Sequence, residues 1–214
     1  GKMLADQGET CLIQMPGRED RLNEKLLTDM PQLVDTLAQE ISAFSKKPFA
    51  FFGHSMGAIV AYETARRLNT MGVSKPTHLF VSARAAPHLQ KNTDLLRFLD
   101  DDAFVDKLQA TYGAVPEAIQ QNSEVRKIFL PILRADVELL ETYDETSSEP
   151  LDLPISALGG ISDPAISRAQ LEGWRARTST KFTYHEFPGD HFYIEEEREA
   201  VMAAIKNDLA DNLY

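Results

Sequence analysis

The sequence predicts an α/β protein with a mostly parallel sheet, and two observations support this expectation. Short apolar runs that stop at Gly or Pro alternate with longer stretches in which apolar residues recur at helical spacing, as in repeated βαβ units. The chain has 214 residues, a length that fits one domain with a single core. We therefore expect one domain over residues 1–214, with helices covering the sheet.

Strands are expected where an apolar or β-branched run stops at turn-forming residues. The expected strands cover residues 9–15, 49–52, 79–83, 154–158 and 181–187. The first run stops at Pro16-Gly17, which predicts a tight turn after it. The second run contains no polar residue, which predicts a central strand buried on both faces.

Helices are expected where apolar residues repeat every three or four positions. The expected helices cover residues 29–44, 58–72, 101–108, 124–143, 167–174 and 195–209. Gly72 ends the second of these, and Ser167 with Gln170 forms a capping box that opens the fifth. The last helix is expected to carry three glutamates in its first turn, Glu195, Glu196 and Glu197. Its buried apolar face is expected to consist of Val201, Ala204, Ile205 and Leu209.

An insertion separates two of the strands. The segment between the strands at 79–83 and 154–158 is too long for one crossover connection, so we expect an insertion over about residues 94–143. Its two helical stretches are amphipathic, which predicts a helical lid. Pro131 predicts a kink in the second stretch.

Charge and composition argue against several classes of function. Lys and Arg number 22 and Asp and Glu number 33, and the net charge of −11 has the wrong sign for binding a nucleic acid. The longest apolar runs are far shorter than the ~18 residues of a membrane span. A single cysteine, Cys11, excludes an internal disulfide and a cysteine-based metal cluster, and no secretory leader pattern opens the chain. We expect a cytoplasmic protein with no membrane span, metal or cofactor.

The pentapeptide Gly53-His54-Ser55-Met56-Gly57 has the form Gly-x-Ser-x-Gly and lies between an apolar run and a helix. In that context the serine occupies a strained strand-to-helix turn that exposes its hydroxyl. We expect a side chain at either glycine to collide with neighbouring backbone. The motif predicts Ser55 as a nucleophile and the Met56 N–H, at the helix N-terminus, as an oxyanion donor.

A serine nucleophile needs a base, and in this arrangement the chain order is serine, acid, histidine. His191 follows the last expected strand, in a loop at the carboxyl edge of the sheet, from which it can reach the serine. The remaining histidines lie in less suitable places. His54 is in the elbow, His78 precedes a strand, His88 lies before the insertion and His185 lies within the last strand.

Two aspartates compete for the role of the acid. Asp163 lies in the loop after the strand at 154–158, where its alternative role is an Asx-turn before Pro164. Asp136 also satisfies the chain order, but it lies on the apolar face of the insertion, where it must either pair with an arginine of the lid or face the active site. Asp190 is too close to His191 along the chain. We favour Asp163.

Several segments together resemble a type II thioesterase, a stand-alone enzyme that accompanies polyketide synthases, nonribosomal peptide synthetases and fatty acid synthases. The segments are GHSMGA at 53–58, LFVS at 79–82, PILRAD at 131–136 with ETY at 141–143, GGISDP at 159–164 and FPGDHF at 187–192. The resemblance extends from QMPGR at 14–18 nearly to the C-terminus. It implies an α/β-hydrolase fold with a helical lid and a triad of Ser55, Asp163 and His191.

The resemblance also implies the reaction: hydrolysis of acyl groups from the phosphopantetheine arm of an acyl or peptidyl carrier protein, in an editing role. Two departures stand out. Members usually begin with a strand and a Gly-rich loop that donates the second oxyanion N–H, so we expect this N-terminal strand and loop to be missing from the chain. Asp190 stands where a glycine is common. Weak candidates for docking an acidic carrier protein are Arg18, Arg21, Arg66 and Arg67.

Other functions stay open at this point. A carboxylesterase, a lipase or an acyltransferase that acts on a free ester uses the same triad. A non-catalytic scaffold that binds an acyl ligand is favoured only if the oxyanion loop is absent. The acyl chain, the partner synthase and the oligomeric state cannot be read from the sequence, and a monomer is compatible with it.

Overall fold

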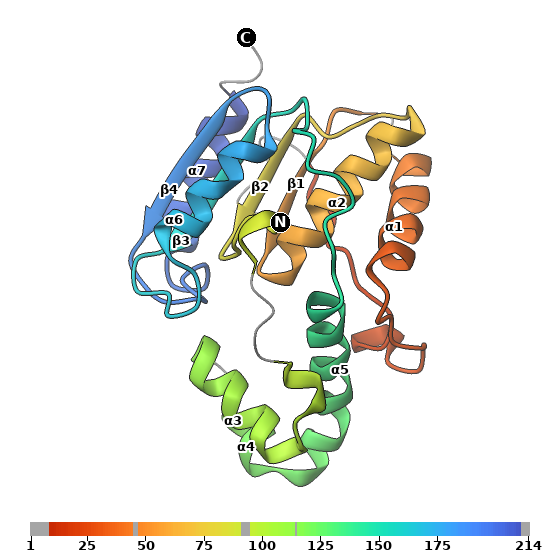
Figure 1. Ribbon diagram of the computed structural model, residues 1–214, viewed down its shortest axis with the longest axis vertical. Helices are drawn as coiled ribbons and strands as arrows, with labels where there is room; N and C mark the ends of the chain where they lie inside the picture. The colour runs from red at the N-terminus through yellow and green to blue at the C-terminus, as the bar shows by residue number, and fades with distance from the viewer. Residues whose placement is uncertain (1–8, 45–46, 91–94, 114, 211–214) are drawn as a thin grey trace. The chain divides into compact units, whose positions relative to one another are not determined.

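A computed structural model describes residues 9–44, 47–90, 95–113 and 115–210 (Figure 1). The chain divides into two compact units. We call residues 1–30 with 92–143 the helical unit, and residues 31–91 with 144–214 the sheet unit. Each is described by itself. Asp94, at the expected start of the insertion, lies outside the described residues.

The sheet unit contains four parallel strands in the order β1-β2-β3-β4. Their bounds are Ala50–His54 for β1, His78–Ser82 for β2, Ile155–Gly160 for β3 and Phe182–Phe187 for β4. Because all four strands are parallel, their carboxyl ends meet at one edge of the sheet, where ligands bind in α/β proteins. The expected α/β class and parallel sheet are confirmed.

Helices cover both faces of this sheet. The helices of the sheet unit are α1 (Met30–Phe44), α2 (Met56–Met71), α6 (Arg168–Glu172) and α7 (Arg198–Ala210), with short 3₁₀ turns η3 (Pro87–Leu89) and η5 (Gly173–Arg177). α2 packs on β1 and β2, and α6 packs on β3. α7 lies on the opposite face, next to β4 (Figure 1), where Val201 and Ile205 share a core with Phe80 and Leu158. As expected, Gly72 ends α2 with a φ of +67° and the capping box at Ser167 opens α6.

Two of the expected strands need correction. The segment 9–15 is not a strand, although the tight turn after it is present, with Gly17 at a φ of +82°. A strand requires a hydrogen-bonded neighbour, and the described part of the helical unit contains no strand. β1 forms as expected, but it is not buried on both faces. It lies at one edge of the described sheet, and Phe52 is 43% exposed.

The start of the last helix also differs from the expectation. Glu195, Glu196 and Glu197 lie in turns before α7, which begins at Arg198. The preceding chain folds back so that Tyr193 enters the core, where it is 1% exposed, and the regular helix starts only after this turn. The apolar buried face is present, and it also contains Asp208, which the pattern did not predict.

The helical unit contains η2 (Glu19–Arg21), η4 (Leu96–Phe98), α3 (Asp101–Tyr112), α4 (Glu117–Gln121) and α5 (Ser123–Glu141). The two helices expected in the insertion are present as α3 and α5, and α5 continues through Pro131. Asp100 caps α3 and Asn122 caps α5 through side-chain oxygens that accept backbone N–H groups. In the described ranges, no helix combines the length and the apolar character needed to cross a membrane.

Candidate active site

Ser55 occupies a strained turn between β1 and α2. Its φ of +52° and ψ of −117° lie in a region that non-glycine residues rarely adopt. The Ser55 N–H donates to the carbonyl of Ser82 at 2.8 Å, so the turn is fixed against the end of β2. The strained strand-to-helix turn expected from the pentapeptide is present.

The two glycines of the pentapeptide serve different purposes. A Cβ atom on Gly53 would lie 2.1 Å from the carbonyl oxygen of Gly57, a distance that real Cβ atoms essentially never show. A Cβ atom on Gly57 would meet nothing within 4 Å. The expectation of a backbone collision is therefore confirmed for Gly53 and wrong for Gly57, whose missing side chain would point away from neighbouring atoms.

The structure brings the three expected residues of the site together. His191 Nε2 lies 3.0 Å from Ser55 Oγ, and His191 Nδ1 lies 2.8 Å from Asp163 Oδ2. The side chains of His191 and Asp163 are 2% and 1% exposed. A serine, a histidine and a carboxylate in this order of contact form the geometry by which a hydroxyl is activated for attack.

Asp163 is fixed by its own loop as well as by His191. Its Oδ1 atom accepts hydrogen bonds from the N–H groups of Ala165 at 2.8 Å and Ile166 at 3.2 Å. The Asx-turn and the contact with His191 were alternatives in the sequence, but the structure contains both. One carboxylate oxygen holds the turn and the other faces the imidazole.

The loops that carry Asp163 and His191 are hydrogen-bonded to each other. The N–H groups of Ile161 and Ser162 donate to the carbonyls of Phe187 and Gly189, both at 2.9 Å. A Cβ atom on Gly160 would lie 2.2 Å from the carbonyl oxygen of Asp190, so this close approach requires a glycine. Asp190 itself accepts from the Phe192 N–H at 2.8 Å and does not orient His191.

Asp136, the competing acid, has a different partner. Its Oδ1 atom lies 2.6 Å from Arg18 of the same helical unit, in a two-fold contact with that guanidinium. Burial raises the pKa of Asp136, and the nearby Arg18 opposes this rise. Asp136 pairs with an arginine as one of the two alternatives expected, but the expectation of a lid arginine is wrong, because Arg18 comes from the N-terminal segment.

The four arginines considered for docking are all engaged within the protein. Arg18 binds Asp136, Arg21 binds Glu24 and Arg67 binds Asp35; Arg66 donates to the carbonyl of Glu149 and contacts Tyr62. The interpretation of these residues as a free basic patch therefore loses support.

The sequence analysis did not predict two residues near the site, Ser82 and Tyr193. It also gave His54 no role beyond its place in the elbow. His54 Nδ1 lies 2.9 Å from Ser82 Oγ, and Ser82 Oγ lies 2.6 Å from the Tyr193 hydroxyl. Ser82 is the register partner of His54 in the β1–β2 pair. The sequence offered no signal for this contact, because the expected strands end at Phe52 and Ala83 and their register was not predicted.

A second serine, histidine and aspartate also lie in contact. Ser156 Oγ lies 2.8 Å from His78 Nε2 and 2.6 Å from Asp208 Oδ2, which also contacts His185 Nε2 at 2.8 Å. Ser156 is inside β3 and fully buried, with ordinary strand backbone. A substrate cannot reach this hydroxyl without opening the sheet, so we interpret the group as a structural network that joins α7 to the strands.

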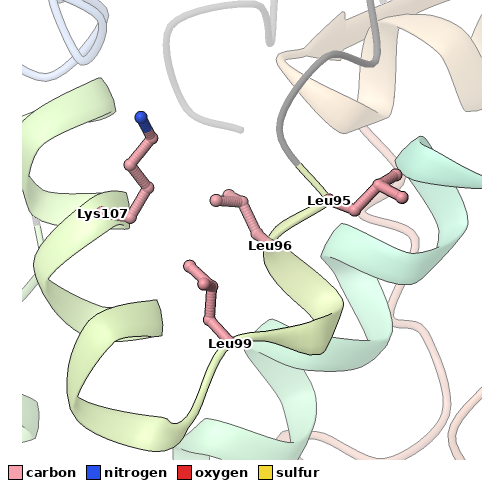
Figure 2. Close-up of a pocket in the computed structure, with 4 residues that line it drawn as sticks. All are labelled: Leu95, Leu96, Leu99 and Lys107. Carbon is pink, nitrogen blue, oxygen red and sulfur yellow. The ribbon is translucent and has the colours of Figure 1, made fainter.

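A small pocket lies in the helical unit, with a volume of about 300 Å³ (Figure 2). It is lined by Leu95, Leu96, Leu99 and Lys107. Figure 2 shows the side chains of Leu96 and Leu99 extending toward the helix that carries Lys107. This lining contains no serine, cysteine, histidine or carboxylate. The chemistry that the described residues support is therefore at Ser55.

Comparison with known proteins gives concordant results. The profile of the thioesterase domain family matches residues 1–209. Over 190 residues the chain is 40% identical to the gramicidin S biosynthesis protein GrsT of Aneurinibacillus migulanus, covering 89% of this chain and 74% of that protein. The structure of the type II thioesterase BorB from the borrelidin biosynthetic cluster is similar with a TM-score of 0.82 and 35% identity, over 95% of this chain and 80% of that one.

One similar protein has a name of another kind. The linear gramicidin dehydrogenase LgrE of Brevibacillus parabrevis is 39% identical over 214 residues, covering 99% of this chain and 81% of that protein. A dinucleotide-binding Gly-x-Gly-x-x-Gly motif needs two glycines separated by one residue. No such pair occurs in this sequence. The dehydrogenase activity in this name is said of LgrE alone.

Proposed function

We propose a reaction for this chain from one premise: it belongs to the thioesterase family, and within it to the type II thioesterases of nonribosomal peptide and polyketide systems. The enzyme hydrolyses acyl thioesters. We assign the chemistry to Ser55, His191 and Asp163, and the observation that supports this assignment is the pair of contacts of 3.0 Å and 2.8 Å that His191 makes with the other two.

In the first half of the reaction, Ser55 Oγ attacks the thioester carbonyl while His191 Nε2 takes the hydroxyl proton. The carbonyl oxygen becomes an oxyanion, for which the Met56 N–H at the start of α2 is the proposed donor. The C–S bond then breaks, His191 returns the proton to the leaving thiolate, and the acyl group remains as an ester on Ser55.

In the second half, His191 takes a proton from water, and the resulting hydroxide attacks the acyl ester. The C–O bond to Ser55 breaks, the serine regains its proton, and the carboxylic acid leaves. Asp163 keeps the imidazole in the tautomer with hydrogen on Nδ1 and stabilises the imidazolium that forms twice per turnover. The two N–H groups that hold its Oδ1 atom support this role.

For the substrate, we propose an acyl chain on the phosphopantetheine arm of an acyl or peptidyl carrier protein, in an editing or release step. The similarity to GrsT, a gramicidin S biosynthesis protein, and to BorB, a type II thioesterase from the borrelidin biosynthetic cluster, supports the proposal. We also propose that the enzyme works in the cytoplasm, together with such carriers.

We further propose that the insertion acts as a lid. It leaves the sheet unit after β2 and returns before β3, and its described residues, 95–113 and 115–143, fold with the N-terminal segment into a separate compact unit. Inserted helices of this kind shield an active site from water and shape the space for the substrate. On this proposal, the helical unit determines which acyl chains are accepted.

The proposed nucleophile is tested by comparing Ser55→Ala with Ser156→Ala. We expect Ser55→Ala to lower kcat on an acyl-pantetheine by at least about 10⁴-fold, because the attacking atom is gone. Ser156→Ala removes a buried hydroxyl from the structural network and should lower the free energy of unfolding by about 1–3 kcal/mol without changing kcat per folded molecule. Turnover and melting temperature are measured for both variants.

Labelling separates this proposal from a binding scaffold and from a free-ester hydrolase. A fluorophosphonate should modify the wild type and Ser156→Ala at Ser55, and should leave Ser55→Ala unmodified. Comparing acyl-pantetheines with p-nitrophenyl esters of the same acyl length identifies the preferred leaving group. Full activity in Ser55→Ala would refute the assignment of the nucleophile.

A further inference from the structure

A chain of three polar side chains joins the elbow to the loop that carries His191. It runs from His54 through Ser82 to Tyr193, with distances of 2.9 Å and 2.6 Å between the polar atoms. His54 ends β1, Ser82 ends β2, and Tyr193 follows β4. The chain therefore connects the strand that presents Ser55 with the loop that presents His191, and it does so without using either reacting atom.

The ring of His54 also packs against that loop. Its centroid lies 5.3 Å from the ring of His191 and 5.9 Å from the ring of Phe192. Tyr193 is held in turn by stacking on Phe187, with centroids 5.4 Å apart and planes 8° apart. Ser82 is fully buried and Tyr193 is 1% exposed, so neither can move to another partner without disturbing the core.

His54 is suited to this position because it stays uncharged. Burial lowers the pKa of His54 to about 4, with a smaller lowering from His191 and an opposing effect of Asp163. In the described part of the protein, the titratable groups next to His54 are His191, Asp163 and, through Ser82, the Tyr193 hydroxyl. At neutral pH a neutral ring therefore lies beside the imidazole that must become positively charged during the reaction.

We propose that His54 is a positioning residue for the hydrolysis: anchored by Ser82 and Tyr193, its ring holds the His191 imidazole at hydrogen-bonding distance from Ser55. The inference rests on the proposed function, since it takes His191 as the base. It adds a role for a residue that neither touches the reacting atoms nor belongs to the triad. The hydrogen-bonded chain, and not the bulk of the ring alone, carries this role.

Two variants break the chain while keeping the packing. Tyr193→Phe removes one hydroxyl and keeps the ring stacked on Phe187, and Ser82→Ala removes the middle link. Because a displacement of about 1 Å in a catalytic group costs on the order of 10²-fold in rate, we expect each variant to lower kcat by about 10- to 100-fold. KM for a short acyl-pantetheine should change little, since neither residue is proposed to contact the substrate.

The effects of Tyr193→Phe and Ser82→Ala on kcat should not be additive. Both break the same chain, so the double variant is expected to have the kcat of the slower single variant. His54→Phe keeps an aromatic ring and removes the hydrogen bond, and it should show the same loss. In all of these variants, the midpoint of the acidic limb of the kcat/KM pH profile should shift, because the surroundings of the base have changed.

Ser156→Ala is the matched control, because it removes a buried serine hydroxyl that contacts a histidine but is not connected to the elbow. It should lower the melting temperature and leave kcat and the pH profile as in the wild type. If Tyr193→Phe and Ser82→Ala behave in the same way, the chain is only structural and the inference is overturned. Failure of the proposed function looks different: the wild type would then show no turnover, or Ser55→Ala would be as active as the wild type.

Discussion

At the scale of single residues, the site depends on how each polar atom is occupied. Asp163 uses one oxygen to hold its own loop and the other to face His191, so the imidazole meets a carboxylate that cannot rotate away. Asp136 has the same functional group, but Arg18 occupies both of its oxygens. Chain order alone left both residues as candidates; their partners distinguish them.

Exchanging the two carboxylates for amides tests this difference. We expect Asp163→Asn to lower kcat by about 10³- to 10⁴-fold, because the amide favours the wrong tautomer of His191. An asparagine oxygen can still accept the two N–H groups of the loop, so the melting temperature should stay close to that of the wild type. The measurement is kcat at saturating acyl-pantetheine.

Asp136→Asn is the comparison for that experiment, since it makes the same chemical change in the helical unit. Its kcat should remain within a few-fold of the wild type, and any effect should depend on the length of the acyl chain if the insertion acts as a lid. A larger loss of kcat in Asp136→Asn than in Asp163→Asn would transfer the role of the acid to Asp136.

At the scale of elements, the elbow depends on one glycine more than on the other. Gly53→Ala would place a methyl group against the backbone of Gly57, so we expect loss of the elbow geometry, with a fall in the free energy of unfolding of at least about 2 kcal/mol. Gly57→Ala has free space in the first turn of α2 and should be neutral or stabilising by up to about 1 kcal/mol. Urea unfolding of both variants measures the difference, and equal destabilisation would contradict the steric argument.

The elements also show what a sequence can predict. The strands β2, β3 and β4 and the helices α2, α3 and α5 were located from local periodicity, which needs no knowledge of neighbours. The segment 9–15 has the same local pattern, but the described part of its unit contains no strand with which it could pair. The edge position of β1 also depends on which strands lie beside it, and a local pattern does not contain this information.

The same distinction applies to the site. Ser55, His191 and Asp163 could be predicted because a motif and a chain order describe them. The contact between Ser82 and Tyr193 joins residues that are 111 positions apart in the sequence, so no local pattern predicts it. The buried group of Ser156, His78 and Asp208 was missed for the same reason, since its members lie on three different elements.

At the scale of the whole molecule, buried histidines make stability depend on pH. Burial lowers the pKa of His78 to about 4, below its ordinary value of 6.5, and His54 is shifted in the same direction. Between these two pH values the unfolded chain binds more protons than the folded chain, so the stabilisation present above pH 6.5 is lost as the pH falls toward 4.

His78→Gln should therefore reduce the acid sensitivity of the sheet unit. Between pH 7 and pH 5, we expect the loss in the free energy of unfolding to be smaller than in the wild type by about 2 kcal/mol. Trp174, the single tryptophan and fully buried in this unit, provides the fluorescence signal. His88→Gln replaces an exposed histidine whose pKa is also lowered by burial, so it should reduce the acid sensitivity less than His78→Gln does. An unchanged slope in His78→Gln would contradict the prediction.

The close approach at Gly160 has a consequence for engineering. The carbonyl of Asp190 occupies the space where a side chain at position 160 would begin, and two further hydrogen bonds join the same two loops. A chimaera that takes residues 161–166 from one relative and 188–193 from another would combine two loops whose backbones do not match at this contact. When loops are exchanged between such enzymes, both should therefore be transferred from the same protein.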